Sequence, residues 1–175
     1  MSSTNKDGTA VPEATEPIGG PVDSDIDVHS PAQRRELTDH PATVLMVIAA
    51  GGALGALSRY GLARIWPTPA GGFPWATFAT NVLGCFLIGV LMVTITEIRP
   101  VHPLTRPFVG VGILGGFTTF STYANETRGL LQPGTVPLAF AYLAGTLVCA
   151  LLATLAAIAL TRTLHGALRE KEAAR

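Results

Sequence analysis

Weak helix formers and hydroxyl side chains gather at the centre of one apolar stretch, residues 104–131. In chain order they are Gly115, Gly116, Thr118, Thr119, Ser121 and Thr122. Glycine destabilises a helix, and the hydroxyls of Thr and Ser compete for its backbone hydrogen bonds. The pattern predicts a break between two half-helices of about ten residues, each about 15 Å long. Carbonyl oxygens freed at such a break could bind a cation, while the N-terminus of a half-helix could face an anion.

One unbroken helix is the alternative interpretation of this stretch. Glycine and threonine often let neighbouring membrane helices pack closely, and their spacing alone leaves both interpretations open. Non-helical backbone inside a bilayer is tolerated only where protein covers it or where it lines a cavity. A break would therefore have to lie within a folded assembly rather than against lipid.

Neutral hydrogen-bond donors and aromatic rings lie in this stretch and in its apolar neighbours. The donors are Asn81, Ser121, Tyr142 and Thr146. A ring edge carries partial positive charge, so Phe120 or Tyr123 could face a small anion without trapping it. Such neutral groups can replace the water around a compact ion and still release it. The ordinary alternatives are that Asn81 links helices and that Phe120 and Tyr123 pack on one helical face.

Charged side chains are scarce between residues 41 and 161, where Glu97 and Glu126 are the acidic residues. Arg59, near the end of the first apolar stretch, could draw anions into a vestibule. It could equally extend to the membrane interface or pair with the C-terminus of a helix. Glu126 could be a vestibule or capping charge and is assigned no role. Because no nucleophile is paired with a base in the apolar stretches, an enzyme is not indicated.

Four apolar segments must position these residues. Each is long enough to cross a hydrocarbon core, which takes about 20 helical residues, and they span residues 43–66, 75–97, 104–131 and 136–160. The sequence is 48% hydrophobic and 14% charged, which favours a membrane protein over a soluble one. The segments lack the alternation of barrel strands. We therefore expect an all-α membrane protein with four transmembrane helices, the third broken near its centre.

Composition and charge divide the chain into three parts. Residues 1–40 are rich in Pro, Ser, Thr, Asp and Glu and are predicted to be a disordered tail. Residues 41–162 are the predicted transmembrane domain, and residues 163–175 are a charged C-terminal tail. Nine basic residues fall on one side of the predicted membrane and three on the other, which places both termini in the cytoplasm. The formal net charge of zero gives no indication of nucleic-acid binding.

Three motifs, in order along the chain, resemble those of the Fluc (CrcB) family of fluoride channels. They are the run from Gly51 to Tyr60, the run from Thr80 to Gly84 around Asn81, and the run from Gly115 to Tyr123 with Glu126 three residues later. The resemblance covers residues 44–160. It implies a passive, fluoride-selective channel in the plasma membrane of a bacterium, which exports fluoride from the cytoplasm and limits its toxicity.

The resemblance also implies an assembly and a set of site residues. Family members are antiparallel, dual-topology dimers with two pores. A structural sodium ion lies at the dimer centre, and here the carbonyl groups of Gly115 and Thr118 would hold it. The residues placed in the fluoride pore are Asn81, Phe120, Ser121, Tyr123, Tyr142 and Thr146, with Arg59 in the vestibule.

Two departures from the family pattern bear on these expectations. Tyr123 stands where many members have phenylalanine, and Ala150 and Leu152 stand where hydroxyl residues often continue along the fourth span. The second departure leaves few hydroxyl groups along the fourth span. Whether both pores conduct is therefore not determined by the sequence. The charge bias also fits poorly with a single chain that inserts both ways. The partner is therefore either a second copy or an oppositely oriented paralogue.

A small proton-coupled exporter of organic cations is the competing function. Such exchange ordinarily needs an acidic residue near the centre of a span. Glu97 and Glu126 both lie off-centre in the predicted spans. A passive anion channel is therefore the favoured interpretation.

Overall fold

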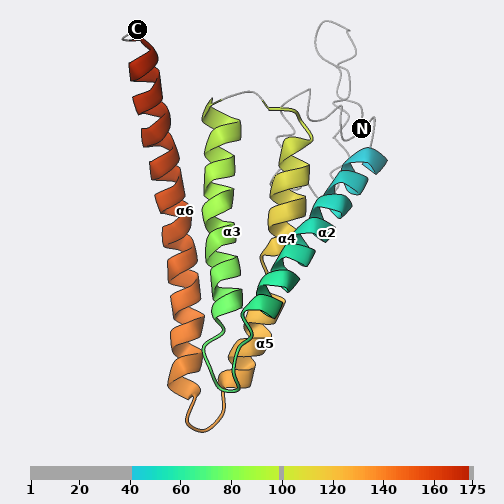
Figure 1. Cartoon of the computed structure of the whole chain (residues 1–175), viewed down its shortest axis with the longest axis vertical. Coiled ribbons are helices and arrows are strands. Elements are labelled where there is room, and N and C mark those ends of the chain that lie inside the picture. Colours follow the sequence, from blue (N-terminus) through green and yellow to red (C-terminus); the bar gives the residue numbers. More distant parts are fainter. Residues whose placement is uncertain (1–40, 99–100, 174–175) are drawn as a thin grey trace, which may run out of the picture. The chain divides into compact units, whose positions relative to one another are not determined.

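The computed structural model describes residues 41–98 and 101–173, and its helices follow the apolar segments. Helix α2 covers Pro41–Ile65, α3 covers Trp75–Val93, and α6 covers Val136–Ala173 (Figure 1). A π-helical turn, η1, continues α3 over Thr94–Ile98. Together with the segment between α3 and α6, these elements make the described part of the chain all-helical, with four helical segments. The predicted disordered tail, residues 1–40, lies outside the described residues.

Three of these helices are long and apolar enough to cross a membrane. They span Ala42–Ile65, Trp75–Ile98 and Val136–Lys171, with mean hydropathies of 1.6, 2.2 and 2.4. The chain is therefore a multi-pass membrane protein. The third apolar segment in chain order does not meet the same length criterion, because it is divided into η2 (Arg106–Leu114, π-helical), α4 (Gly115–Phe117) and α5 (Ser121–Leu130).

The helical backbone of this third segment is interrupted between α4 and α5. Thr118 is extended, with φ −73° and ψ 158°. Its N–H and its hydroxyl both donate to the carbonyl of Leu114, each at 2.9 Å. The hydroxyl of Thr119 accepts the N–H of Thr122 at 3.2 Å, as a helix cap does. Hydroxyl groups thus take over backbone hydrogen bonds here.

Gly116 of α4 is itself helical, and together with Gly112 of η2 it explains how closely α2 approaches. A Cβ atom on Gly116 would overlap the carbonyl oxygen of Gly52, and one on Gly55 would overlap that of Ile113. Gly112 and Gly116 are four residues apart and share one helical face. Close packing through small residues is therefore a structural role of these glycines.

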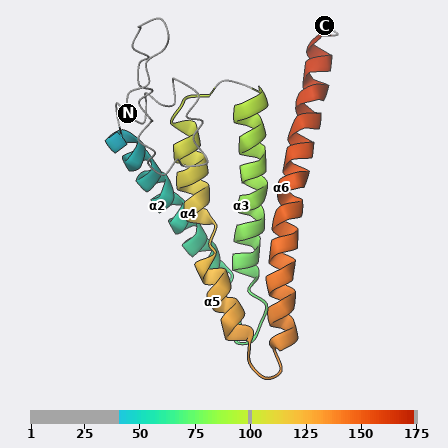
Figure 2. The same cartoon turned by 180° about the vertical axis from the view of Figure 1, so that it is seen from behind.

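Helices α3 and α6 run side by side in the same direction (Figures 1 and 2). The hydroxyl of Thr154 on α6 donates to the carbonyl of Cys85 on α3 at 3.0 Å. Farther along, Nε of Arg162 donates to Oε2 of Glu97 at 2.9 Å within a salt bridge. Helix α6 then continues to Ala173, beyond the predicted end of the span at residue 160.

Candidate functional site

The side chain of Asn81 on α3 pairs with the interrupted backbone. Its Nδ2 donates to the carbonyl of Thr119 at 3.0 Å, and its Oδ1 accepts the N–H of Thr119 at 2.9 Å. Because an N–H must meet Oδ1 and a carbonyl must meet Nδ2, the two bonds fix the orientation of the amide. The structure thus gives Asn81 a backbone partner that sequence reasoning did not predict.

Arg59 on α2 reaches the other side of the interruption. Its Nε donates to the carbonyl of Gly116 at 3.3 Å, and its side chain is half-buried. This carbonyl lies near the C-terminus of α4, where a positive charge is favourable. Of the alternatives that the sequence left open for Arg59, pairing with a helix end is present in the structure.

Two carbonyl groups at the interruption are left for other ligands. Among the described residues, no donor reaches the carbonyl oxygens of Gly115 and Thr118. Gly115 is exposed, and a Cβ there would come no closer than 4.0 Å to the carbonyl oxygen of Gly110. No group of three or more His, Cys, Asp or Glu side chains within residues 41–98 and 101–173 could hold a metal ion.

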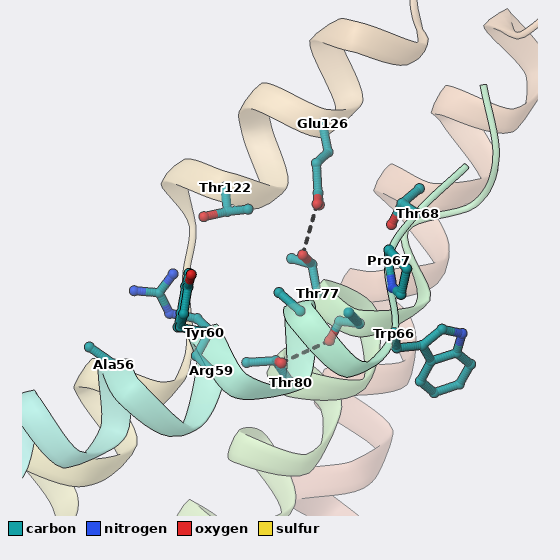
Figure 3. A pocket seen from close by; sticks show the side chains of 12 residues that line it. Ala56, Arg59, Tyr60, Trp66, Pro67, Thr68, Thr77, Thr80, Thr122 and Glu126 are labelled. Carbon is teal, nitrogen blue, oxygen red and sulfur yellow. Dashed lines mark hydrogen bonds between the residues drawn. The ribbon is translucent and has the colours of Figure 1, made fainter. Parts of the chain in front are cut away.

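A pocket of about 480 Å³ lies beside the interruption, between α2, α3 and α5 (Figure 3). Its polar lining residues are Arg59, Tyr60, Thr68, Thr77, Thr80, Thr122 and Glu126. One cationic and one anionic side chain therefore share the same pocket.

Glu126 is held by donors from two other helices. Thr77 on α3 donates to Oε1 at 2.9 Å, and Tyr142 on α6 donates to Oε2 at 2.7 Å (Figure 3 shows the first of these bonds). Sequence reasoning gave Glu126 no role and overlooked Thr77. The available signal was a lone carboxylate in an apolar stretch, which requires partners when buried.

Three aromatic residues form a series that leads away from the interruption. The rings of Phe120 and Tyr123 are 5.9 Å apart, and those of Tyr123 and Tyr142 are 5.2 Å apart. The hydroxyl of Tyr123 donates to the carbonyl of Leu143 at 2.6 Å. Tyr123 and Tyr142 are buried, whereas the side chain of Phe120 is 79% exposed.

The remaining predicted donors differ in what they contact. Thr146 is 4% exposed, and its hydroxyl finds no hydrogen-bond partner in the described part of the chain. Ser121 is exposed, and its hydroxyl lies 3.4 Å from that of Thr119. Thr154 was not predicted from the sequence. Its hydroxyl lies within hydrogen-bonding distance of two carbonyl oxygens, those of Cys85 and Ala150. The spacing of eight residues between Thr146 and Thr154, two steps of four on one helical face, was the signal that could have identified Thr154.

The fold defines a multi-pass, all-helical membrane protein with polar side chains gathered around an interrupted helix. Residues 46–158 match the family model described as CrcB-like protein, Camphor Resistance. The chain belongs to this family, which confirms the resemblance seen in the sequence.

Relatives of this chain carry the names of ion channels rather than of enzymes. "Fluoride-specific ion channel FluC 1" of Streptomyces coelicolor is 57% identical over 124 residues, which cover 70% of this chain and 80% of the relative. "FluC 2" of Streptomyces avermitilis is 53% identical over 122 residues, covering 70% and 77%. "FluC" of Saccharophagus degradans is 42% identical over 127 residues, covering 71% and 96%. Streptomyces avermitilis also has a "FluC 3", 45% identical over 119 residues, covering 68% and 58%.

Proposed function

We propose that this protein is a passive, fluoride-selective channel that lets fluoride leave the bacterial cytoplasm. The observation that carries the proposal is the grouping of neutral donors and aromatic rings around the interrupted helix. Neutral groups suit an ion that must shed water, pass and leave again. The names of the relatives support fluoride as that ion.

The proposed ion path passes hydrogen-bond donors whose hydrogens are not all used by other groups of the described residues. The amide of Asn81 has two hydrogens, of which one is used by Thr119. The hydroxyl of Thr146 is buried without a partner among the described residues. The ring edge of Phe120 can face the ion. Many family members have phenylalanine at the position of Tyr123. The hydroxyl of Tyr123 already donates to the carbonyl of Leu143, so its ring is the part that remains available to an anion.

An antiparallel dimer with two pores is the assembly that we propose. The interrupted segment is the third crossing of the membrane, and its extended backbone has to be covered by protein rather than by lipid. Phe120, at 79% exposure, and Gly115 lie open on one chain. A second chain would cover them. Because the charge bias of this chain fits poorly with insertion in both directions, an oppositely oriented paralogue is as good a partner as a second copy.

The carbonyl oxygens of Gly115 and Thr118 fit a structural sodium ion at the centre of this dimer. Neither oxygen accepts a hydrogen bond from the described residues, and oxygen ligands from unwound backbone suit sodium. Two chains related by a twofold axis would supply four such oxygens. The bound cation would offset the negative ends of carbonyl dipoles that the two chains bring together.

Ion release from liposomes tests the proposed function. The purified protein should release fluoride and retain chloride when the potassium ionophore valinomycin clamps the membrane potential. Asn81→Ala and Phe120→Ile should slow fluoride release, whereas Asn125→Ala, at an exposed amide, is the matched control. Equal release of the two halides, or release that requires a proton gradient, would rule out a passive fluoride channel.

A further inference from the structure

The amide of Asn81 occupies both backbone hydrogen-bonding groups of a single residue, Thr119. One bond runs in each direction, at 3.0 and 2.9 Å. In an antiparallel β-sheet, a residue of the neighbouring strand satisfies both backbone groups in this way. Here one side chain from α3 does so across 38 positions of sequence. Asn81 is therefore a structural partner of the interruption as well as a polar group beside it.

Thr119 depends on this pairing because it lies between helices. A backbone N–H or carbonyl without a partner is costly away from water, and helix geometry supplies none here. Other groups at the interruption have separate partners: the N–H of Thr118 reaches Leu114, and the carbonyl of Gly116 reaches Arg59. Both groups of Thr119 are satisfied by Asn81.

Phe120 follows Thr119 directly and has little else to fix it. Its side chain is 79% exposed, and the ring of Tyr123 is its aromatic neighbour within the chain, 5.9 Å away. Within one chain, the position of this ring therefore depends on the backbone that carries it, and this backbone sets where the ring would meet a second chain. That backbone is held immediately upstream by Asn81.

We propose that Asn81 is a positioning residue, whose paired bonds with Thr119 hold the interrupted backbone and thereby aim the ring of Phe120. The proposal rests on the proposed function only in that ring placement is tied to fluoride passage. The same pairing leaves Asn81 one amide hydrogen for an anion. Its two roles can be separated, because the backbone role persists without fluoride.

Hydrogen exchange measures the backbone role directly. In the assembled full-length protein, without fluoride, the Thr119 amide should exchange about tenfold faster in Asn81→Ala than in wild type, since it loses its acceptor. Asn125→Ala removes an amide that contacts Arg128 and should leave exchange at Thr119 unchanged. An unchanged Thr119 exchange rate in Asn81→Ala would overturn the proposal, whatever happens to fluoride release.

An ester at position 119 tests the same bond without touching Asn81. The Thr119→Ala variant would be prepared in two forms. One form keeps the normal amide, and in the other an ester oxygen replaces the N–H of residue 119. If Asn81 acts through this bond, the ester form should release fluoride several-fold more slowly than the amide form, and this difference should disappear when both forms also carry Asn81→Ala, which an effect on the Thr118 carbonyl would not do. Equal rates would mean that Asn81 serves passage only by contacting the ion. Fluoride release by the wild type decides the channel function separately.

Discussion

The hydroxyl of Tyr142 donates to Oε2 of Glu126 at 2.7 Å, which ties α6 to α5 through a carboxylate. The side chain of Tyr142 is fully buried, and Thr77 donates to the other carboxylate oxygen. A carboxylate away from water is tolerated when donors surround it. Three helices therefore share one charged group near the proposed ion path.

Replacing Tyr142 with phenylalanine should weaken the fold and slow fluoride release. The change removes one of the two donors to Glu126, and a hydrogen bond to a charged group contributes about 2 kcal/mol. Thermal unfolding in detergent should show a lower midpoint for Tyr142→Phe. Tyr60→Phe is the matched control, because that side chain is 62% exposed. Equal midpoints for the two variants would contradict the role given to this bond.

Gly116→Ala should destabilise the chain severely, by about 3 kcal/mol or more, because the new methyl group would overlap the carbonyl of Gly52. Gly61→Ala on α2 meets nothing within 4 Å and is the control. Its midpoint should stay the same or rise, since alanine favours a helix. A stable Gly116→Ala protein would show that α2 and α4 are farther apart than the structure places them.

Gly115→Ala should leave the single chain folded but weaken the proposed dimer. Within one chain a Cβ at this position meets only the Gly110 carbonyl at 4.0 Å, which is ordinary contact. At a twofold axis the same methyl group would face its counterpart beside the cation. Single-molecule photobleaching in liposomes should show more monomers than in Gly129→Ala, where the added group meets nothing within 4 Å. An intact Gly115→Ala dimer would place the twofold axis elsewhere.

Substitutions of Arg59 should separate its charge from its hydrogen bond. If it draws anions into the pocket, Arg59→Lys should keep most of the fluoride release, while Arg59→Gln loses several-fold. That gap should narrow as salt rises, because the Debye length is about 10 Å at 0.1 M and shorter above it. If Arg59→Lys slows fluoride release as much as Arg59→Gln does, then the hydrogen bond from Nε of Arg59 to the Gly116 carbonyl matters more for release than the positive charge.

Hydrophobic length and turn residues were sufficient to place most of the helices. Helices α3 and α6 begin at Trp75 and Val136, as the apolar segments predicted. The end of α6 was not predictable in this way, because hydropathy marks where lipid ends rather than where a helix ends. Residues 161–173 are mostly good helix formers, and the helix continues through them.

The sequence identified polar residue types around the candidate site but not their partners. Asn81 stood out as an amide in an apolar segment, yet its pairing with Thr119 depends on how α3 packs against the interruption. Glu126 stood out as a rare carboxylate, but the donors that hold it come from distant parts of the chain. Such partners follow from tertiary packing, which no local pattern contains.

Helix α6 contains 38 residues and is therefore about 57 Å long at 1.5 Å per residue. A bilayer core is about 30 Å thick, so a good part of this helix must stand in headgroups and water. It can act as a stiff spacer for a reporter fused at the C-terminus and hold that reporter clear of the lipid. The compartment in which each reporter signals would then reveal the direction in which its own copy was inserted.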